Sequence, residues 1–422
     1  MAFPLSDYGY SSKQEVLDDA KRYWNPDKTA FWQDEGIPLV IGEREGYVLT
    51  DLDGHRLIDM HLNGGTYNIG HRNPRAIAAL TRALEHADVG NHHFPAVART
   101  ALARELVRTA PEGIEKVVFG SSGGESVDLA IKSARWATGR RRIVSIRKAY
   151  HGHTGLSIGA GDERFSRLFH ADRSDEFVQV PFNDLDAMAE VLAAGDVAAV
   201  ILETIPATYG FPLPDPGYLA AVAELAHRTG ALYIADEVQT GLMRTGALWA
   251  ITKSGAQPDI IVTGKGLGGG IYPVTAALLN GRAAGWLEVD GFAHMATFGG
   301  SEVGAAVALE VLDIVTAPET VANVRRQSAR LADAFAELMI RFPGALVGIR
   351  QDGLVIGLEF SPAIGGAKPV MRGLYERGVW AIFSTLDPVV LQFKPGLLVD
   401  DDTVDQAVAA LTGTLESLAV PA

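Results

Sequence analysis

The chain has 422 residues, no cysteine and a formal net charge of −14 at pH 7, from 37 Lys and Arg against 51 Asp and Glu. This charge excludes a nucleic-acid-binding protein built on a general basic face. The lack of cysteine excludes disulfides, zinc–thiolate sites and thiolate nucleophiles and fits a reducing compartment. The length exceeds what one small core usually organises, so we expect two lobes.

The first residues contain no charged segment followed by an apolar one, which a secretory signal would require. The most apolar stretches, 197–202, 231–235 and 260–262, are far shorter than the roughly 20 residues that span a bilayer. We therefore expect a cytoplasmic protein that neither crosses a membrane nor binds nucleic acid.

Strands and helices alternate through the middle of the chain. The spacing of apolar residues predicts helices over 126–138 and 216–228. Short apolar runs predict strands at 116–120, 142–146, 197–203, 231–237 and 259–263. Because continuous apolar runs indicate strands that are buried on both faces, we expect a mostly parallel α/β sheet.

The two ends of the chain differ from this pattern. Residues 47–60 predict a small antiparallel unit. From Glu310 onward the sequence predicts a long helix, followed by strands near 354–360 and 391–395 and a final helix. We therefore expect three stretches to form two domains: a large domain over 61–309, and a smaller domain that joins 310–422 to the N-terminal segment 1–60.

Ligands of parallel sheets bind at the carboxyl ends of the strands, and polar clusters follow several predicted strands. Residues 120–126 join a strand to a helix, so their small side chains and the helix N-terminus favour a phosphate. A glycine-rich turn capped by Ser122 fits the same residues. Asp236 ends an apolar strand, where it could pair with a cationic ring nitrogen or order a loop.

Lys265 stands between glycines just after a predicted strand. Small neighbours leave room for a bulky adduct on its amine, as a Schiff base requires, although an exposed loop lysine fits too. Tyr150 follows another strand, where its ring could stack on a planar cofactor or pack in the core. A phosphate site, an aromatic ring, a buried acid and an isolated lysine are together the parts needed to hold pyridoxal phosphate (PLP).

Gly264, Gly266 and Gly269 match the G-x-G-x-x-G dinucleotide pattern. A true example opens a helix, whereas the residues that follow here, 271–279, predict a strand with a proline near its start. A nicotinamide-dependent oxidoreductase is therefore a distant alternative. The histidine pairs at 92–93 and 151/153 lack a third ligand at recognisable spacing, so we expect no metal site.

From about Gly46 to Val399 the chain resembles the class III, ornithine/GABA-type aminotransferases of PLP fold type I. The matching motifs are Ser122-Gly-Gly-Glu-Ser, Tyr150-His-Gly, Asp236-Glu-Val-Gln-Thr-Gly, Arg244-Thr-Gly, Lys265-Gly-Leu-Gly-Gly-Gly and Ala296-Thr-Phe-Gly-Gly. The resemblance implies a PLP-dependent aminotransferase that moves an amino group from a donor to a keto or aldehyde acceptor. It also implies a large domain with helices on both faces of a mostly parallel sheet, and a smaller α+β domain from the two chain ends.

The resemblance implies a role for each matching residue. Lys265 would form the Schiff base with the cofactor and shuttle a proton, and Asp236 would pair with the pyridinium nitrogen. Val238 and Tyr150 would cover the two faces of the ring. The other implied cofactor contacts are Gln239 and Glu203 near the ring hydroxyl, and Ser122, Gly123 and Gly124 at the phosphate. Thr297 would reach the cofactor phosphate of the partner subunit, which implies a homodimer.

One departure from the family bears on the substrate. Many members carry R-[FL]-x-P-P-L, whose arginine clamps a substrate carboxylate with two hydrogen bonds, but this chain has Gln392 at that position. A neutral amide cannot replace the paired, charged donors of an arginine. Lys394 shares the strand face of Gln392 only if the strand is regular. We therefore expect an amine, an amino sugar or an unusual amino acid as one substrate. The other half-reaction can still use a common amino acid and its keto acid.

Trp32 and Tyr67 fall in stretches that line the family's substrate pocket, although they equally suit a hydrophobic core. An aminomutase or amino-acid epimerase of the same fold is the main alternative function, because these enzymes share the lysine at position 265. The run Tyr150-His-Gly-His153 also resembles the glutamate-semialdehyde aminomutase branch.

Overall fold

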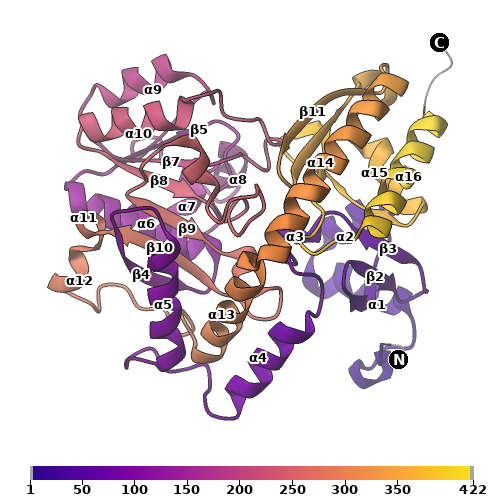
Figure 1. The fold of residues 1–422 in the computed structure, drawn as a ribbon, viewed down its shortest axis with the longest axis horizontal. Helices are drawn as coiled ribbons and strands as arrows, with labels where there is room; N and C mark the ends of the chain where they lie inside the picture. The colour runs from indigo at the N-terminus through magenta and orange to yellow at the C-terminus, as the bar shows by residue number, and fades with distance from the viewer. Residues whose placement is uncertain (1–2, 419–422) are drawn as a thin grey trace.

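The largest sheet has seven strands in the order β4-β10-β9-β8-β7-β5-β6, in a computed structural model that describes residues 3–418 (Figure 1). In that order the strands are Ile114–Gly120, Thr275–Asn280, Ile260–Thr263, Leu232–Asp236, Val197–Glu203, Arg142–Ile146 and Phe177–Val180. β10 runs antiparallel to both of its neighbours, and the pairings among β5 to β9 are parallel. The predicted mostly parallel sheet is therefore confirmed.

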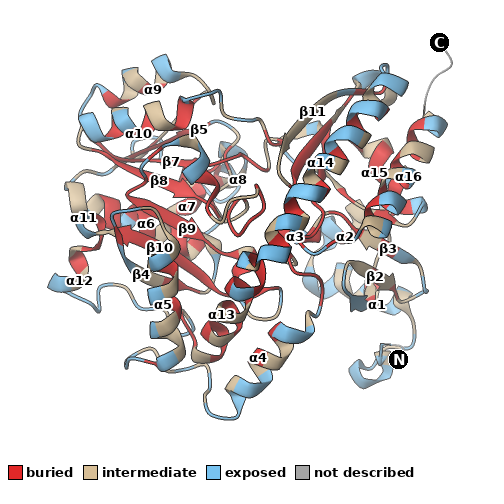
Figure 2. Ribbon diagram, viewed as in Figure 1, coloured by how far each residue is buried: buried red, intermediate tan, exposed pale blue. Residues whose placement is uncertain are grey.

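Helices cover both faces of this sheet (Figure 2). Val200 and Leu202 of β7 belong to one apolar cluster, and Ala199 and Ile201 belong to the other. One face packs against α5 (Val97–Thr109), α9 (Leu185–Leu192), α10 (Tyr218–Arg228) and α13 (Glu302–Thr316). The other packs against α6 (Gly123–Thr138), α7 (Ser157–Ala160), α11 (Gly281–Ala284) and α12 (Trp286–Val289). Burial on both faces explains why these strands are continuous apolar runs.

The second lobe has two smaller sheets. One is antiparallel, in the order β11-β12-β15-β14: Leu346–Asp352, Val355–Phe360, Asp387–Phe393 and Ile382–Ser384. The other has the order β1-β2-β3-β13: Ile41–Glu45, Val48–Asp51, Arg56–Asp59 and Val379–Trp380. Since β13 pairs with β3, a C-terminal strand completes the sheet of the N-terminal segment. Domain boundaries after residues 60 and 309 stay a prediction.

Helices of both chain ends surround these smaller sheets (Figure 1). They are α1 (Lys13–Asp19), α2 (Pro26–Asp34), α14 (Pro318–Arg341), α15 (Ala367–Glu376) and α16 (Asp401–Leu418). One apolar cluster joins Leu49 and Leu57 of the N-terminal segment to Phe335, Phe360 and Phe393 near the C-terminus. The remaining helices are α3 (Leu62–Gly65), α4 (Pro74–Leu84) and α8 (Glu163–Arg167). Among residues 3–418 we find no helix with the length and apolarity of a membrane span.

Two differences between the predicted and observed elements occur at prolines. The long helix expected from Glu310 is two helices, α13 and α14, because the chain turns at Ala317 and Pro318 opens the second. Proline lacks the backbone N–H that a continuing helix needs but suits a first helical position. The strand expected from Ile271 begins only at Thr275, two residues after Pro273.

We predict that Ile201→Ala lowers the free energy of unfolding by about 2–5 kcal/mol, since Ile201 is fully buried in β7 and its loss leaves a cavity. Urea titration followed by circular dichroism measures the change. Leu168→Ala is the matched control, because Leu168 is 78% exposed and its loss should change stability by less than about 0.5 kcal/mol. Equal losses in the two variants would contradict the prediction.

Candidate active site

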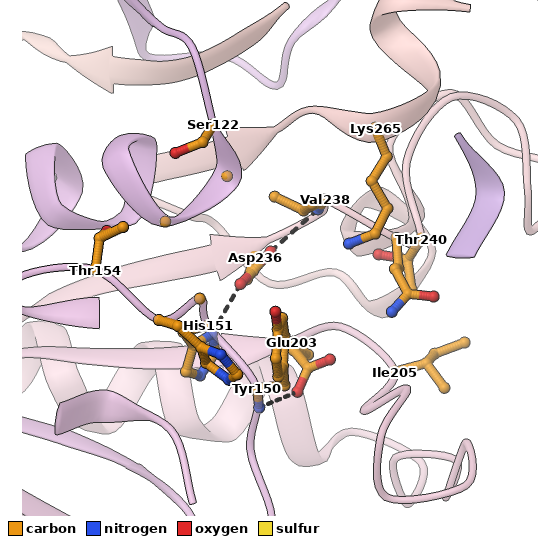
Figure 3. A pocket seen from close by; sticks show the side chains of 15 residues that line it. Ser122, Tyr150, His151, Thr154, Glu203, Ile205, Asp236, Val238, Thr240 and Lys265 are labelled. Carbon is orange, nitrogen blue, oxygen red and sulfur yellow. Dashed lines mark hydrogen bonds and ion pairs between the residues drawn. The ribbon is translucent and has the colours of Figure 1, made fainter. Parts of the chain in front are cut away.

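A cavity of about 270 Å³ lies where β7, β8 and β9 end, beside the N-terminus of α6 (Figure 3). Nine of the site residues predicted from sequence line it: Ser122, Gly123, Gly124, Tyr150, Glu203, Asp236, Val238, Gln239 and Lys265. They come from separate stretches of the chain that the parallel strands bring to one edge of the sheet. The cavity is also lined by residues for which we predicted no role in the site: His151, Gly152, His153, Thr154, Ile205 and Thr240.

Lys265 lies two residues after the end of β9, and its side chain extends into the cavity (Figure 3). Its backbone has a φ of 45°, in the left-handed region that residues other than glycine rarely adopt. Such positions cost free energy and are enriched at functional sites. Burial lowers the pKa of the Lys265 ammonium, although Asp236 and Glu203 act in the opposite direction. A lowered pKa increases the fraction of neutral amine, which is the nucleophilic form.

Asp236 is the last residue of β8 and is buried. One carboxylate oxygen lies 2.7 Å from His151 Nδ1, and the other accepts a hydrogen bond of 3.1 Å from the backbone N–H of Val238 (Figure 3). Because an ionised carboxylate only accepts hydrogen bonds, Nδ1 of His151 carries the proton in this contact. His151 therefore fixes the orientation of the carboxylate. His151 belongs to the Tyr150-His-Gly motif, and this motif was the sequence signal for it.

Glu203 ends β7 and lies beside Asp236 across the β7–β8 pairing. Its two carboxylate oxygens accept backbone hydrogen bonds from Tyr150, at 2.9 Å, and from Ala207, at 3.1 Å. Burial raises the pKa of Glu203 to about 7, and Asp236 contributes in the same direction. Glu203 therefore ties the Tyr150 segment to the sheet and exchanges its proton near neutral pH.

The N-terminus of α6 forms one wall of the cavity (Figure 3). Ser122 caps this 16-residue helix by accepting a hydrogen bond of 3.2 Å from the backbone N–H of Glu125. A Cβ at Gly124 would lie 2.7 Å from Thr154 Oγ1, so this position has no room for a side chain. The unpaired backbone N–H groups of a helix N-terminus, together with its dipole, suit an anion such as phosphate.

Four predicted site residues do not line this cavity. Thr297 lies in an exposed segment that precedes α13. The Trp32 ring packs edge-on against Trp380 in the second lobe, with ring centroids 5.4 Å apart, and the Tyr67 ring lies 4.0 Å from that of His71. Gln392 is buried next to the cavity residues, where its Nε2 donates to the backbone oxygen of Ala207 at 3.1 Å.

The chain matches the family model described as aminotransferase class-III over residues 31–415. The chain belongs to the class III aminotransferases. An uncharacterized aminotransferase of Archaeoglobus fulgidus is 40% identical over 97% of this chain and 95% of its own length. An acetylornithine aminotransferase of Xylella fastidiosa is 33% identical over 89% and 92%. The ornithine aminotransferase structure from Toxoplasma gondii superposes with a TM-score of 0.88 at 24% identity, covering 98% of this chain and 97% of the other.

These similarities confirm the fold type I architecture and the transaminase activity expected from the motifs. Enzymes of this class depend on PLP, so the aminotransferase is a PLP-dependent enzyme. The dinucleotide interpretation of the glycines around Lys265 is wrong for a structural reason. Gly266 lies in one 3₁₀ turn, Lys265–Gly268, that Gly264 and Gly269 flank, and the chain then enters the antiparallel strand β10 and not a helix.

The pKa of Glu203 predicts a pH dependence of the apoprotein. Because it lies near 7 in the folded chain and near 4.5 in the unfolded chain, folding favours the protonated form. The resulting stability is complete below pH 4.5 and is lost as the pH rises to about 7. Between pH 5 and 8 the wild type should lose about 2–3 kcal/mol more of its free energy of unfolding than Glu203→Gln, which cannot ionise.

Urea unfolding at a series of pH values measures this difference. Glu163→Gln is the control, because the side chain of Glu163 is exposed on α8 and removing its charge should leave the wild-type pH profile intact. Parallel profiles for the wild type and Glu203→Gln would contradict the prediction.

Proposed function

We propose that PLP binds in this cavity with Lys265 as its covalent partner, Asp236 at its pyridinium nitrogen and the N-terminus of α6 at its phosphate. The observation that carries the proposal is that the amine of the partly buried Lys265 and the carboxylate of the buried Asp236 face one cavity whose wall is a helix N-terminus (Figure 3). Amine, carboxylate and anion site match the aldehyde, the ring nitrogen and the phosphate of PLP in chemical type.

The other lining residues fit this placement. Val238 lies against the phosphate end, because a Cβ at Gly123 would be 3.5 Å from its side chain. We assign Val238 and Tyr150 to opposite faces of the cofactor ring. Contacts with the ring hydroxyl are assigned to Gln239 and Glu203, and contacts with the phosphate to Ser122, Gly123 and Gly124.

When bound, PLP supplies an aldehyde that condenses with amines and a ring that accepts the electron pair released at the substrate Cα. Lys265 Nζ would be the positioned base and acid that moves a proton between the substrate Cα and C4′ of the cofactor. Asp236 holds the proton on the ring nitrogen, because an anionic partner favours the charged form of that nitrogen. His151 keeps the Asp236 carboxylate in position through its 2.7 Å hydrogen bond.

The substrates are a small-molecule amino donor and a keto or aldehyde acceptor. We propose an amine, an amino sugar or an unusual amino acid as one of them, because Gln392 stands where many family members have an arginine. The structure supports this proposal. The amide of Gln392 already forms hydrogen bonds with the Ala207 backbone and with Lys394, so it has no pair of free donors for a substrate carboxylate.

We also propose a cytoplasmic homodimer in which Thr297 reaches the phosphate of the partner subunit's cofactor. Thr297 is exposed, and its neighbour Phe298 is 54% exposed. Phe94, 73% exposed, lies close to the same segment, because Arg99 donates hydrogen bonds to the backbone oxygens of both Phe94 and Gly300. Exposed large apolar side chains around one polar contact residue are typical of a surface that another chain covers.

We predict that Lys265→Ala lowers the rate of amino transfer by on the order of 10³-fold or more, because no other group at the cavity combines an amine with a proton-transfer role. Amino transfer is followed in a coupled assay, and circular dichroism checks the fold. Lys116→Ala, at a half-exposed position on β4, should keep the wild-type rate. Full activity of Lys265→Ala would refute the assignment.

An absorption spectrum separates a transaminase from its alternatives. A single amino donor, added without an acceptor, should convert the visible band of the wild-type holoenzyme stably into the near-ultraviolet band of the aminated cofactor. A visible band that no donor in a broad panel bleaches would favour an epimerase or an aminomutase. Absence of a visible band after addition of PLP would overturn the cofactor assignment.

For the dimer, we predict that Phe298→Glu reduces the mass measured by light scattering from twice 45.0 kDa towards 45.0 kDa, because a charge would be buried in the interface. Ile340→Glu is the control, since Ile340 is also exposed, at 79%, but lies on α14 in the second lobe. A wild-type mass of 45.0 kDa, or a Phe298→Glu dimer as tight as the wild type, would refute this interface.

A further inference from the structure

Lys394 follows β15 directly and is buried, with 2% of its surface exposed. Its Nζ donates one hydrogen bond of 2.6 Å to Gln392 Oε1 and another of 3.2 Å to Gln239 Oε1. The same nitrogen lies 5.4 Å from the centroid of the Phe211 ring. Lys394 and Gln392 therefore share one face of the strand end, and the side chain is held in a single place.

The surroundings of this amine are poor in negative charge. Both of its acceptors are neutral amides, and within residues 3–418 no carboxylate forms an ion pair with it. Burial lowers the pKa of Lys394 well below its usual value, and Arg244 and Lys265 act in the same direction, with Asp59 opposing them. Burial disfavours the charged form of an amine, so an anion bound beside Lys394 would stabilise the ammonium form of this side chain.

Lys394 is also one hydrogen bond away from the cavity. Gln239, which accepts from it, lines that cavity together with Lys265. A Cβ at Gly64 would lie 3.0 Å from Lys265 Cε and 3.6 Å from Gln239 Oε1, so the amide of Gln239 and the stem of Lys265 flank the same glycine. In its protonated form the amine has three N–H donors. Gln392 and Gln239 accept hydrogen bonds from two of them, and the third is available to an anion that enters beside Lys394.

We propose that Lys394 binds the carboxylate of the amino acid or keto acid substrate and makes the enzyme prefer acids to amines in that half-reaction. The inference rests on the proposed function of the neighbouring cavity and assigns a residue of this chain to one of its two substrates. The amide oxygens of Gln392 and Gln239 accept hydrogen bonds from the Lys394 ammonium and so hold it in position. A lysine gives a single point charge and not the two-pronged contact of an arginine, so the acid is held less rigidly.

Binding to the holoenzyme tests this proposal without turnover. Isothermal titration calorimetry compares 3-phenylpropionate with the neutral 3-phenylpropionamide, and propionate with propionamide. The wild type should bind the acids more tightly than the amides. Lys394→Met, which keeps the length of the side chain, should weaken binding of the acids about 10-fold or more and leave the amides within about 3-fold. Lys394→Arg should restore the preference for acids.

The half-reaction gives a second readout. Stopped-flow absorption compares L-phenylalanine with 2-phenylethylamine and L-alanine with ethylamine. Lys394→Met should raise the half-saturating concentration of the amino acids and leave that of the amines unchanged, whereas Lys116→Met should change neither. Acid binding by Lys394→Met that equals the wild type, or a wild type that binds acids no better than amides, would overturn the proposal.

These outcomes are separable from failure of the proposed function. If Lys265→Ala keeps full activity or no visible band forms with PLP, the cavity assignment fails whatever Lys394 does. If the visible band forms and amines react, while acids neither bind nor react in the wild type, only the assignment of Lys394 fails.

Discussion

Burial of three parallel strands between two helix layers is the constraint on which the site depends. β7, β8 and β9 are buried along their whole lengths, so their polar residues can appear only where the strands end. The pairing register sets Glu203 opposite Asp236, and Asp236 opposite Val262, three residues before Lys265. Two carboxylates and an amine thus meet at one edge of the sheet because the strands that carry them are parallel and in register.

Charges at this edge are balanced through hydrogen bonds more than through ion pairs. Asp236 is satisfied by His151 and a backbone N–H, and Glu203 by two backbone N–H groups. The burial that raises the pKa of Glu203 also lowers the pKa of Lys265. Opposite shifts in neighbouring groups bring both closer to neutral pH, which is the range in which proton exchange is easiest.

The sequence predicted those features of the fold and the site that depend on local sequence patterns. Continuous apolar runs identified the buried strands, and the clusters that follow these strands, together with the family motifs, gave nine members of the cavity. Contacts between distant segments were not predictable in this way. His151 meets Asp236 across 85 positions of sequence, and Lys394 meets Gln239 across 155. No periodicity encodes such pairs, because they depend on how whole elements pack. The turn between α13 and α14 at Pro318 was readable and was missed.

The left-handed backbone at Lys265 lowers the stability of the fold at the same position that carries the amine needed for activity. A residue with a side chain pays roughly 1–2 kcal/mol to adopt this conformation, and only glycine adopts it freely. Glycine, however, has no amine to offer. The protein therefore cannot relieve this strain by substitution without losing the group that the cavity surrounds. Gains in thermal tolerance, whether by natural drift or by design, have to come from positions elsewhere, such as the packing of β9 against β10 or the helix layers that hold the turn in place.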